Sequence, residues 1–214
     1  YDLNFSLFGF PVRVHPAFLI LPLLLGASLL QDPNVNAGIM LLLLVVIFFI
    51  SILVHELGHA FAYRKYGGRP QIVLHGMGGV AMAHGHFNRK QSIIITLGGP
   101  FFGLVLGAVF WGFSFWINLQ ENVYIAFLFL FMMQVNIFWS LLNLLPILPL
   151  DGGQLLGHLM HGRRPVLRGK IGTGCAIAMG IALYVFFDSF YSLLLFGFLA
   201  YQNYQAMQRA GRSF

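Results

Sequence analysis

Long apolar runs with few charged positions between them dominate the chain and predict its organisation. The helices that these runs predict cover residues 14–30, 37–66, 91–118, 122–145, 171–187 and 189–208. A helix needs about 20 mostly apolar residues to cross a bilayer. We therefore expect an all-α polytopic membrane protein with about six transmembrane helices.

The connection after the second predicted helix, residues 67–90, has a different pattern. Two apolar stretches flank a glycine cluster there, which is typical of a β-hairpin. Further along, Pro146 and Pro149 end the fourth predicted helix, and a short helix is expected over residues 154–160. No shift in composition marks a second domain, so residues 1–214 are interpreted as one domain.

Composition supports a membrane environment. Hydrophobic residues make up 58% of the chain and charged residues only 8%, whereas a soluble domain carries roughly 25% charged residues. So little charge leaves too few polar side chains to cover a water-facing surface. The lipid bilayer is therefore the expected solvent for most of the chain.

The charges also predict an orientation. With six spans, all 12 lysines and arginines fall on one side of the membrane, and the opposite loops carry Asp32, Glu121 and Asp188. This distribution follows the positive-inside rule and predicts that both termini are cytoplasmic. The basic side can contact anionic head groups. Nucleic-acid binding is not expected, because the basic residues orient the chain instead of forming a binding stripe.

A candidate catalytic motif lies near the end of the second predicted helix, at His55-Glu56-Leu57-Gly58-His59. Residues four apart share a helix face, so both imidazoles can bind one metal ion. Glu56 can then act as a general base on the attacking water. The motif is short, but it lies roughly 13 Å inside the charged edge at Arg64, where ionisable residues are costly. The alternative is a buried His/Glu hydrogen-bonding cluster.

A third metal ligand can be sought by elimination, because a catalytic zinc usually has three protein ligands. Of the six acids, three lie on the opposite side of the membrane and one is near the N-terminus. With Glu56 as the base, Asp151 remains. An alternative role for Asp151 is the N-cap of a helix over residues 152–160.

These motifs together resemble one known family. The His55–His59 motif, combined with Asn143-Leu-Leu-Pro-Ile-Leu-Pro-Leu-Asp151-Gly-Gly, is similar to the site-2 protease family of intramembrane zinc metalloproteases. Residues 8–16 resemble the family's N-terminal strand and first span, and Gly98-Gly99-Pro100 is similar to its third-span motif. The resemblance thus covers nearly the whole chain. It implies zinc held by His55, His59 and Asp151, with Glu56 as catalytic base.

The resemblance implies further roles. Asn143 matches a family asparagine near the active site, which could hydrogen-bond a developing oxyanion; an interhelical hydrogen bond is an equal alternative. Residues 70–87 match a membrane-associated hairpin, where an exposed strand could pair with an extended substrate. The chain looks like the minimal membrane core of the family.

The third predicted helix carries Gly99, Gly103 and Gly107, one every four residues. Small residues at this spacing let helices approach closely. Gly103 is also a departure from the family, which often has an asparagine there. The departure leaves the expected metal site intact.

The expected function is hydrolysis of peptide bonds in or near transmembrane segments of membrane proteins, in regulated intramembrane proteolysis. The expected location is a prokaryotic cytoplasmic membrane, and a regulatory membrane partner is compatible with this activity. A metal transporter or an inactive metal-binding homologue is the alternative, because both keep intramembrane His and Asp. A zinc protease with a glutamate as third ligand is disfavoured, since Glu121 lies on the wrong side. Two further histidine pairs, His84 with His86 and His158 with His161, could bind a metal or approach the cleft, but they are interpreted as solvated or interfacial because no acid or cysteine joins them. His15, before Pro16, is interpreted as an interfacial residue.

Overall fold

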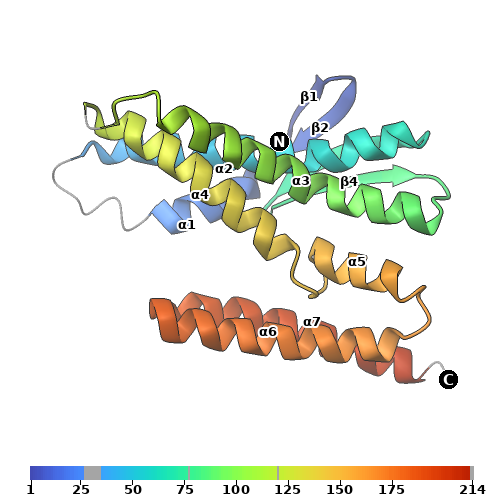
Figure 1. Ribbon diagram of the computed structural model, residues 1–214. Helices are drawn as coiled ribbons and strands as arrows, with labels where there is room; N and C mark the ends of the chain where they lie inside the picture. Colours follow the sequence, from blue (N-terminus) through green and yellow to red (C-terminus); the bar gives the residue numbers. More distant parts are fainter. Residues whose placement is uncertain (27–34, 77, 120, 213–214) are drawn as a thin grey trace. The chain divides into compact units, whose positions relative to one another are not determined.

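The computed structural model describes residues 1–26, 35–76, 78–119 and 121–212. The chain forms two compact units (Figure 1). The first contains residues 1–86 and 98–140, and the second contains residues 87–97 and 141–214.

The longest helix of the first unit is α2, Ala37–Lys65. Asn36 caps its start by accepting a hydrogen bond from the Ile39 N–H at 3.1 Å. Arg64 and Lys65 lie in its last turn, where cations suit the negative end of the helix dipole. These signals are local, and the predicted helix over residues 37–66 is accordingly confirmed almost to the residue.

A four-stranded sheet packs in the same unit, in the order β1-β2-β3-β4. Its strands are β1 Leu3–Leu7, β2 Phe10–Val14, β3 Arg69–His75 and β4 Gly78–His84. The β3–β4 pair is the predicted hairpin. Strand β2 lies in residues 8–16, where the resemblance implies an N-terminal strand, whereas β1 adds to the prediction. Strand β2 pairs with β3 in parallel, and buried residues of both strands pack with those of α2. This packing fixes the hairpin against the helix that carries the motif.

Helix α3, Arg89–Ser114, runs from the second unit into the first. In the first unit it meets α2 at backbone contact, because a Cβ on Gly98 would lie 2.6 Å from the carbonyl oxygen of Gly58. The contact of α3 with α4, Val123–Asn143, is also close at Gly107. A Cβ built on Gly107 would lie 2.9 Å from a side-chain atom of Ile137. The close packing predicted from the glycine spacing is therefore confirmed.

The second unit contains α5 Asp151–Leu159, α6 Pro165–Phe187 and α7 Phe190–Arg212. Helices α6 and α7 lie side by side (Figure 1). The amide of Asn203 in α7 bonds both backbone groups of Leu148, accepting from its N–H at 3.0 Å and donating to its carbonyl at 2.8 Å. These two hydrogen bonds hold the segment with Pro146 and Pro149 that leads into α5.

Four of the described helices are long and apolar enough to cross a bilayer: α2, α3, α4 and α6. The first predicted span instead begins as a 3-10 helix, Pro16–Leu19, followed by α1, Ile20–Gly26, and its residues 27–30 lie outside the described part. The last predicted span exists as α7, but its second half is too polar to meet the same criterion. The helical membrane class is thus confirmed, and four of the six expected spans are supported.

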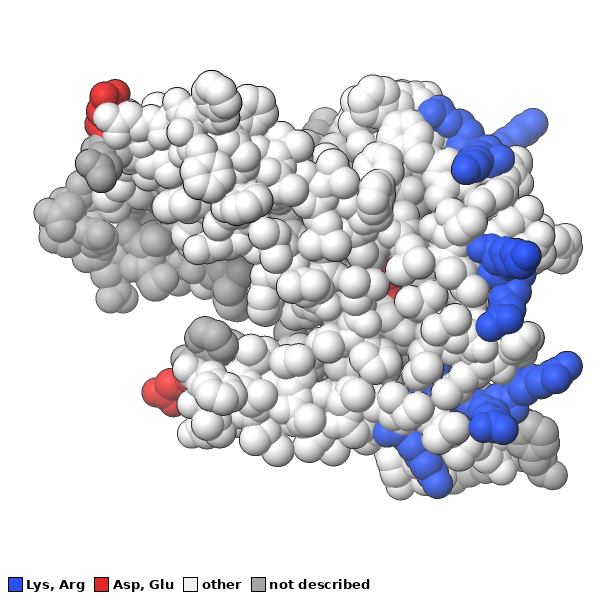
Figure 2. All heavy atoms as spheres, in the orientation of Figure 1, with Lys and Arg blue, Asp and Glu red and all other residues white. Residues whose placement is uncertain are grey.

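Charge is polarised within each unit taken by itself. In Figure 2 the visible lysines and arginines of each unit gather at one end, and an acidic side chain lies at the other. In the second unit, Arg164 precedes α6 and Asp188 caps its C-terminal end. In the first, α2 ends at Arg64 and Lys65. Each unit therefore has one basic end, as expected for segments that cross a membrane.

Candidate metal centre

The two histidines of the motif converge in the first unit. His55 and His59 lie one turn apart on α2, and their Nε2 atoms are 3.3 Å apart. The residues are only 3% and 9% exposed. Two buried imidazoles with their ring nitrogens aimed at the same point are suited to a shared divalent ion.

Gly99 of α3 provides the space in front of these nitrogens. A Cβ built on Gly99 would lie 2.6 Å from Nε2 of His55 and closer still to Nε2 of His59. A zinc–imidazole bond is about 2.0–2.1 Å long, so the point that a Cβ would fill is near the position of a shared ion. The donor atoms and the room beside them therefore fit a metal.

We predict that Gly99→Ala weakens zinc binding by at least about 10-fold, because the new methyl group displaces the ion or the imidazoles. Gly112→Ala, on the same helix, is the matched control, since a Cβ there meets no atom within 4 Å. Competition with a chromophoric chelator measures both affinities. Equal affinity in the two variants would show that Gly99 does not border the metal.

Glu56 lies beside the pair, on the side of α2 that faces the hairpin. It is 5% exposed, and a Cβ on Gly79 of β4 would lie 2.8 Å from its Oε1 atom. The backbone of the edge strand thus runs directly against the carboxylate. The candidate base therefore follows His55 directly in α2 and borders the backbone of β4.

Asp151 belongs to the second unit, as the first residue of α5, and is 8% exposed. The N-cap of α5 is Leu150, which makes no side-chain capping bond. The alternative reading of Asp151 as the N-cap is therefore wrong. A Cβ on Gly152 or Gly153 would overlap backbone atoms of residues 144–148. The turn of α5 that begins with Asp151 is therefore packed closely against that backbone. Two imidazoles and one carboxylate form a donor set that could hold a metal ion.

Asn143, the last residue of α4, is also assigned to the second unit and is 8% exposed. The structure thus brings His55, His59 and Glu56 together within one unit.

Sequence reasoning missed a polar cluster one turn before His55. Asn136 of α4 donates from Nδ2 to Ser51 Oγ at 2.8 Å and to the Met132 carbonyl at 2.7 Å. Ser51 and Asn136 are each 1% exposed. Polar residues inside apolar spans were the available signal. The cluster ties α4 to the turn of α2 that precedes the first histidine.

The other histidines do not form a second centre among the described residues. His15 accepts a hydrogen bond from the Ala17 N–H through Nδ1 at 3.1 Å. Burial, together with nearby Arg168, lowers the pKa of His158. No acid or cysteine joins His158 or His161 in a metal-ligating group within the described part of the chain.

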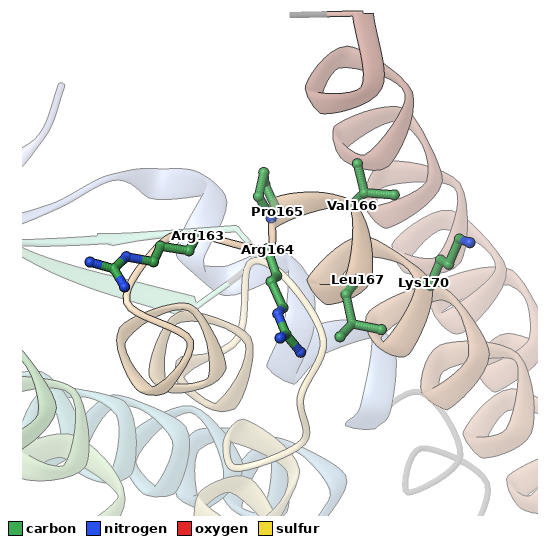
Figure 3. A pocket seen from close by; sticks show the side chains of 6 residues that line it. All are labelled: Arg163, Arg164, Pro165, Val166, Leu167 and Lys170. Carbon is green, nitrogen blue, oxygen red and sulfur yellow. The ribbon is translucent and has the colours of Figure 1, made fainter. Parts of the chain in front are cut away.

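A separate cavity of about 300 Å³ lies in the second unit, at the start of α6 (Figure 3). Its lining residues are Arg163, Arg164, Pro165, Val166, Leu167 and Lys170. The two arginine side chains point in different directions (Figure 3). This lining has no metal-ligating side chain and none of the predicted site residues.

Comparison with protein families links both motifs to peptidases. The model of peptidase family M50 matches residues 117–187, which include Asp151. A second model, described as "Putative zincin peptidase", matches residues 48–148, which include both histidines.

Individual relatives agree with these matches. A zinc metalloprotease of Methanocaldococcus jannaschii is 28% identical over 85% of this chain and 52% of its own length. Stage IV sporulation protein FB of Bacillus subtilis is 32% identical over 72% of this chain and 49% of its own length. The chain thus spans about half the length of these relatives.

Among solved structures, the site-2 protease from Methanocaldococcus jannaschii matches with a TM-score of 0.64 at 24% identity. The match covers 97% of this chain and 95% of that one. At this identity the likeness establishes the fold.

Proposed function

We propose that the chain is an intramembrane zinc metalloprotease of the site-2 protease family, peptidase family M50. Its reaction is hydrolysis of peptide bonds in or near the transmembrane segments of membrane proteins. The observation that carries the proposal is the pair of buried Nε2 atoms 3.3 Å apart on a helix apolar enough to span a bilayer. A buried carboxylate, Glu56, lies next to that pair in the sequence.

The proposed ligands are Nε2 of His55, Nε2 of His59 and the carboxylate of Asp151. Three protein ligands with one open position are the usual arrangement of a catalytic zinc. When bound, zinc supplies a Lewis acid that polarises the scissile carbonyl and lowers the pKa of the attacking water. The donor types and the room beside Gly99 support this assignment.

Glu56 is the proposed general base. Its carboxylate takes a proton from the water as the water's oxygen attacks the carbonyl carbon, and then gives it to the leaving amine as the C–N bond breaks. Its burial strengthens its electrostatic interactions with the reacting groups. Asn143 is proposed to donate a hydrogen bond from its side-chain amide to the carbonyl oxygen as negative charge develops there.

Substrate presentation is assigned to β4. Within the described sheet, β4 lies at the edge and pairs only with β3, and its Gly79 backbone lies against Glu56. A substrate strand added to this edge would be held by main-chain hydrogen bonds. A helical segment must unwind first, because its carbonyls are engaged in its own hydrogen bonds.

The finer membrane arrangement is also part of the proposal. The two units act together as one protease domain with six spans and both termini cytoplasmic, in a prokaryotic cytoplasmic membrane. The basic end of each unit supports this orientation. Substrates are membrane-spanning proteins, and a regulatory membrane partner controls their access.

The test is reconstitution of the full chain in proteoliposomes with a panel of single-span proteins. We expect cleavage in or near the transmembrane segment, located by mass spectrometry, that is abolished by a chelator and restored by zinc. If the zinc-loaded protein cleaves none of the panel and instead carries zinc across the membrane, the transporter alternative is correct.

A further inference from the structure

The first residue of α3 holds the last turn of α5. Arg89 donates from Nε to the carbonyl oxygen of His158 at 2.9 Å and from Nη2 to that of Leu159 at 3.0 Å. Both acceptors lie at the C-terminal end of α5, where helix carbonyls lack intrahelical partners. Arg89 donates to the Leu159 carbonyl and adds a second donor to the His158 carbonyl, which also accepts from the His161 N–H at 3.2 Å. Its positive charge complements the negative end of the helix dipole.

Helix α5 depends on such contacts. It has 9 residues, three of them glycine, and glycine is a poor helix former. Helices this short are marginal by themselves. The glycines are needed for packing, because a Cβ on Gly157 would overlap the Arg168 guanidinium and one on Gly152 would overlap the Leu144 carbonyl. The sequence of α5 thus favours close packing at the expense of intrinsic stability.

We propose that Arg89 is a positioning residue for the metal centre. By holding the C-terminal turn of α5, it prevents the helix from fraying or tilting and so fixes the first turn, which carries Asp151. The inference rests on the proposed function, since it requires Asp151 to be a ligand.

The position of Arg89 in the chain gives this contact a second consequence. Arg89 begins α3, the same continuous helix that carries Gly99 against the two imidazoles. One side chain therefore connects the helix that borders the histidine pair with the helix that carries the proposed third ligand. In the sequence, Arg89 comes soon after the end of β4, Gly78–His84, the proposed substrate strand.

The experiment compares Arg89→Ala, Arg89→Lys and Lys90→Ala in the full-length protein. Lys90 is the matched control, because it is the adjacent exposed cation and its side chain makes no hydrogen bond or ion pair with any described residue. Zinc affinity is measured by chelator competition and the visible spectrum of the Co²⁺-loaded protein is recorded. Hydrogen exchange of the α5 amides is followed in the metal-free protein, and kcat and KM are determined on a cleaved substrate.

For Arg89→Ala we expect zinc affinity to fall by about 10-fold or more, with a changed Co²⁺ spectrum, faster exchange in α5, a lower kcat and a KM within twofold. Arg89→Lys should recover part of each loss, because one ammonium can still bond a carbonyl. Lys90→Ala should match the wild type. If Arg89→Ala does not fold, Arg89→Lys decides, and wild-type affinity and exchange in that variant would overturn the proposal.

Asp151→Asn separates this inference from the proposed function. If Asp151→Asn loses zinc while Arg89→Ala keeps the affinity of Lys90→Ala, the positioning role of Arg89 is wrong and the ligand set stands. If Asp151→Asn keeps full zinc affinity, the ligand set itself is wrong and the inference falls with it.

Discussion

Glu56→Gln should leave zinc binding unchanged and reduce the hydrolysis rate by about 10²- to 10⁴-fold, the usual contribution of a general base. Glutamine has nearly the shape of glutamate, so it fits the buried site against Gly79. Its amide cannot take a proton from water. Single-turnover cleavage of a reconstituted substrate measures the rate, and metal analysis measures the zinc content.

Glu121→Gln is the control for this variant. It makes the same chemical change at an exposed acid whose Oε1 accepts a hydrogen bond from Asn118 Nδ2 at 2.9 Å. It should cleave at the wild-type rate. Normal cleavage by Glu56→Gln would exclude Glu56 as the base, and loss of zinc from that variant would indicate that Glu56 is a ligand.

Asp151→Asn should lower zinc affinity by more than about 100-fold, because even losing a hydrogen-bond partner of a metal ligand costs about 10- to 100-fold. The change removes the negative charge and keeps the volume of a side chain that is 8% exposed. Zinc content after dialysis against a graded series of chelator concentrations measures the loss.

Asp188→Asn is the matched change away from the centre. Asp188 caps α6 in the left-handed conformation, with φ +50°, which asparagine also adopts. Its zinc affinity should equal that of the wild type. Equal affinities in Asp151→Asn and Asp188→Asn would remove Asp151 from the ligand set.

Helix positions were predictable where the signals are local. The apolar run, the Asn36 cap and the basic last turn together define α2, and the motif places both imidazoles on one face through helix geometry alone. The convergence of His55 and His59 follows from their spacing. These features depend on neighbours in sequence, so one sequence suffices to predict them.

Features that depend on distant partners were harder to predict. Strand β2 forms because residues far along the chain complete it, as in the pairing of Val12 with Ile72. The space beside the imidazoles is left by Gly99, which is brought there by the contact of Gly98 with Gly58. A glycine spacing predicts close packing, but it does not identify the residue that lies opposite.

The first apolar run shows a different limit. Hydropathy predicted a helix over residues 14–30, whereas His15 caps a 3-10 turn and the α-helix begins at Ile20. Pro16 at the start of that turn fits this late beginning. The apolar composition of the segment predicted that a helix forms there, but the local capping at His15 determined where the α-helix begins.

The central claim is that one zinc ion joins the two imidazoles of α2 to the carboxylate of α5. The most direct measurement is a crystal structure of the zinc-loaded protein with anomalous data at the zinc edge. We predict one peak at about 2.0–2.2 Å from Nε2 of His55, Nε2 of His59 and a carboxylate oxygen of Asp151, with Glu56 not coordinated. A zinc peak on the histidines without Asp151, or at another place in the protein, would contradict the account.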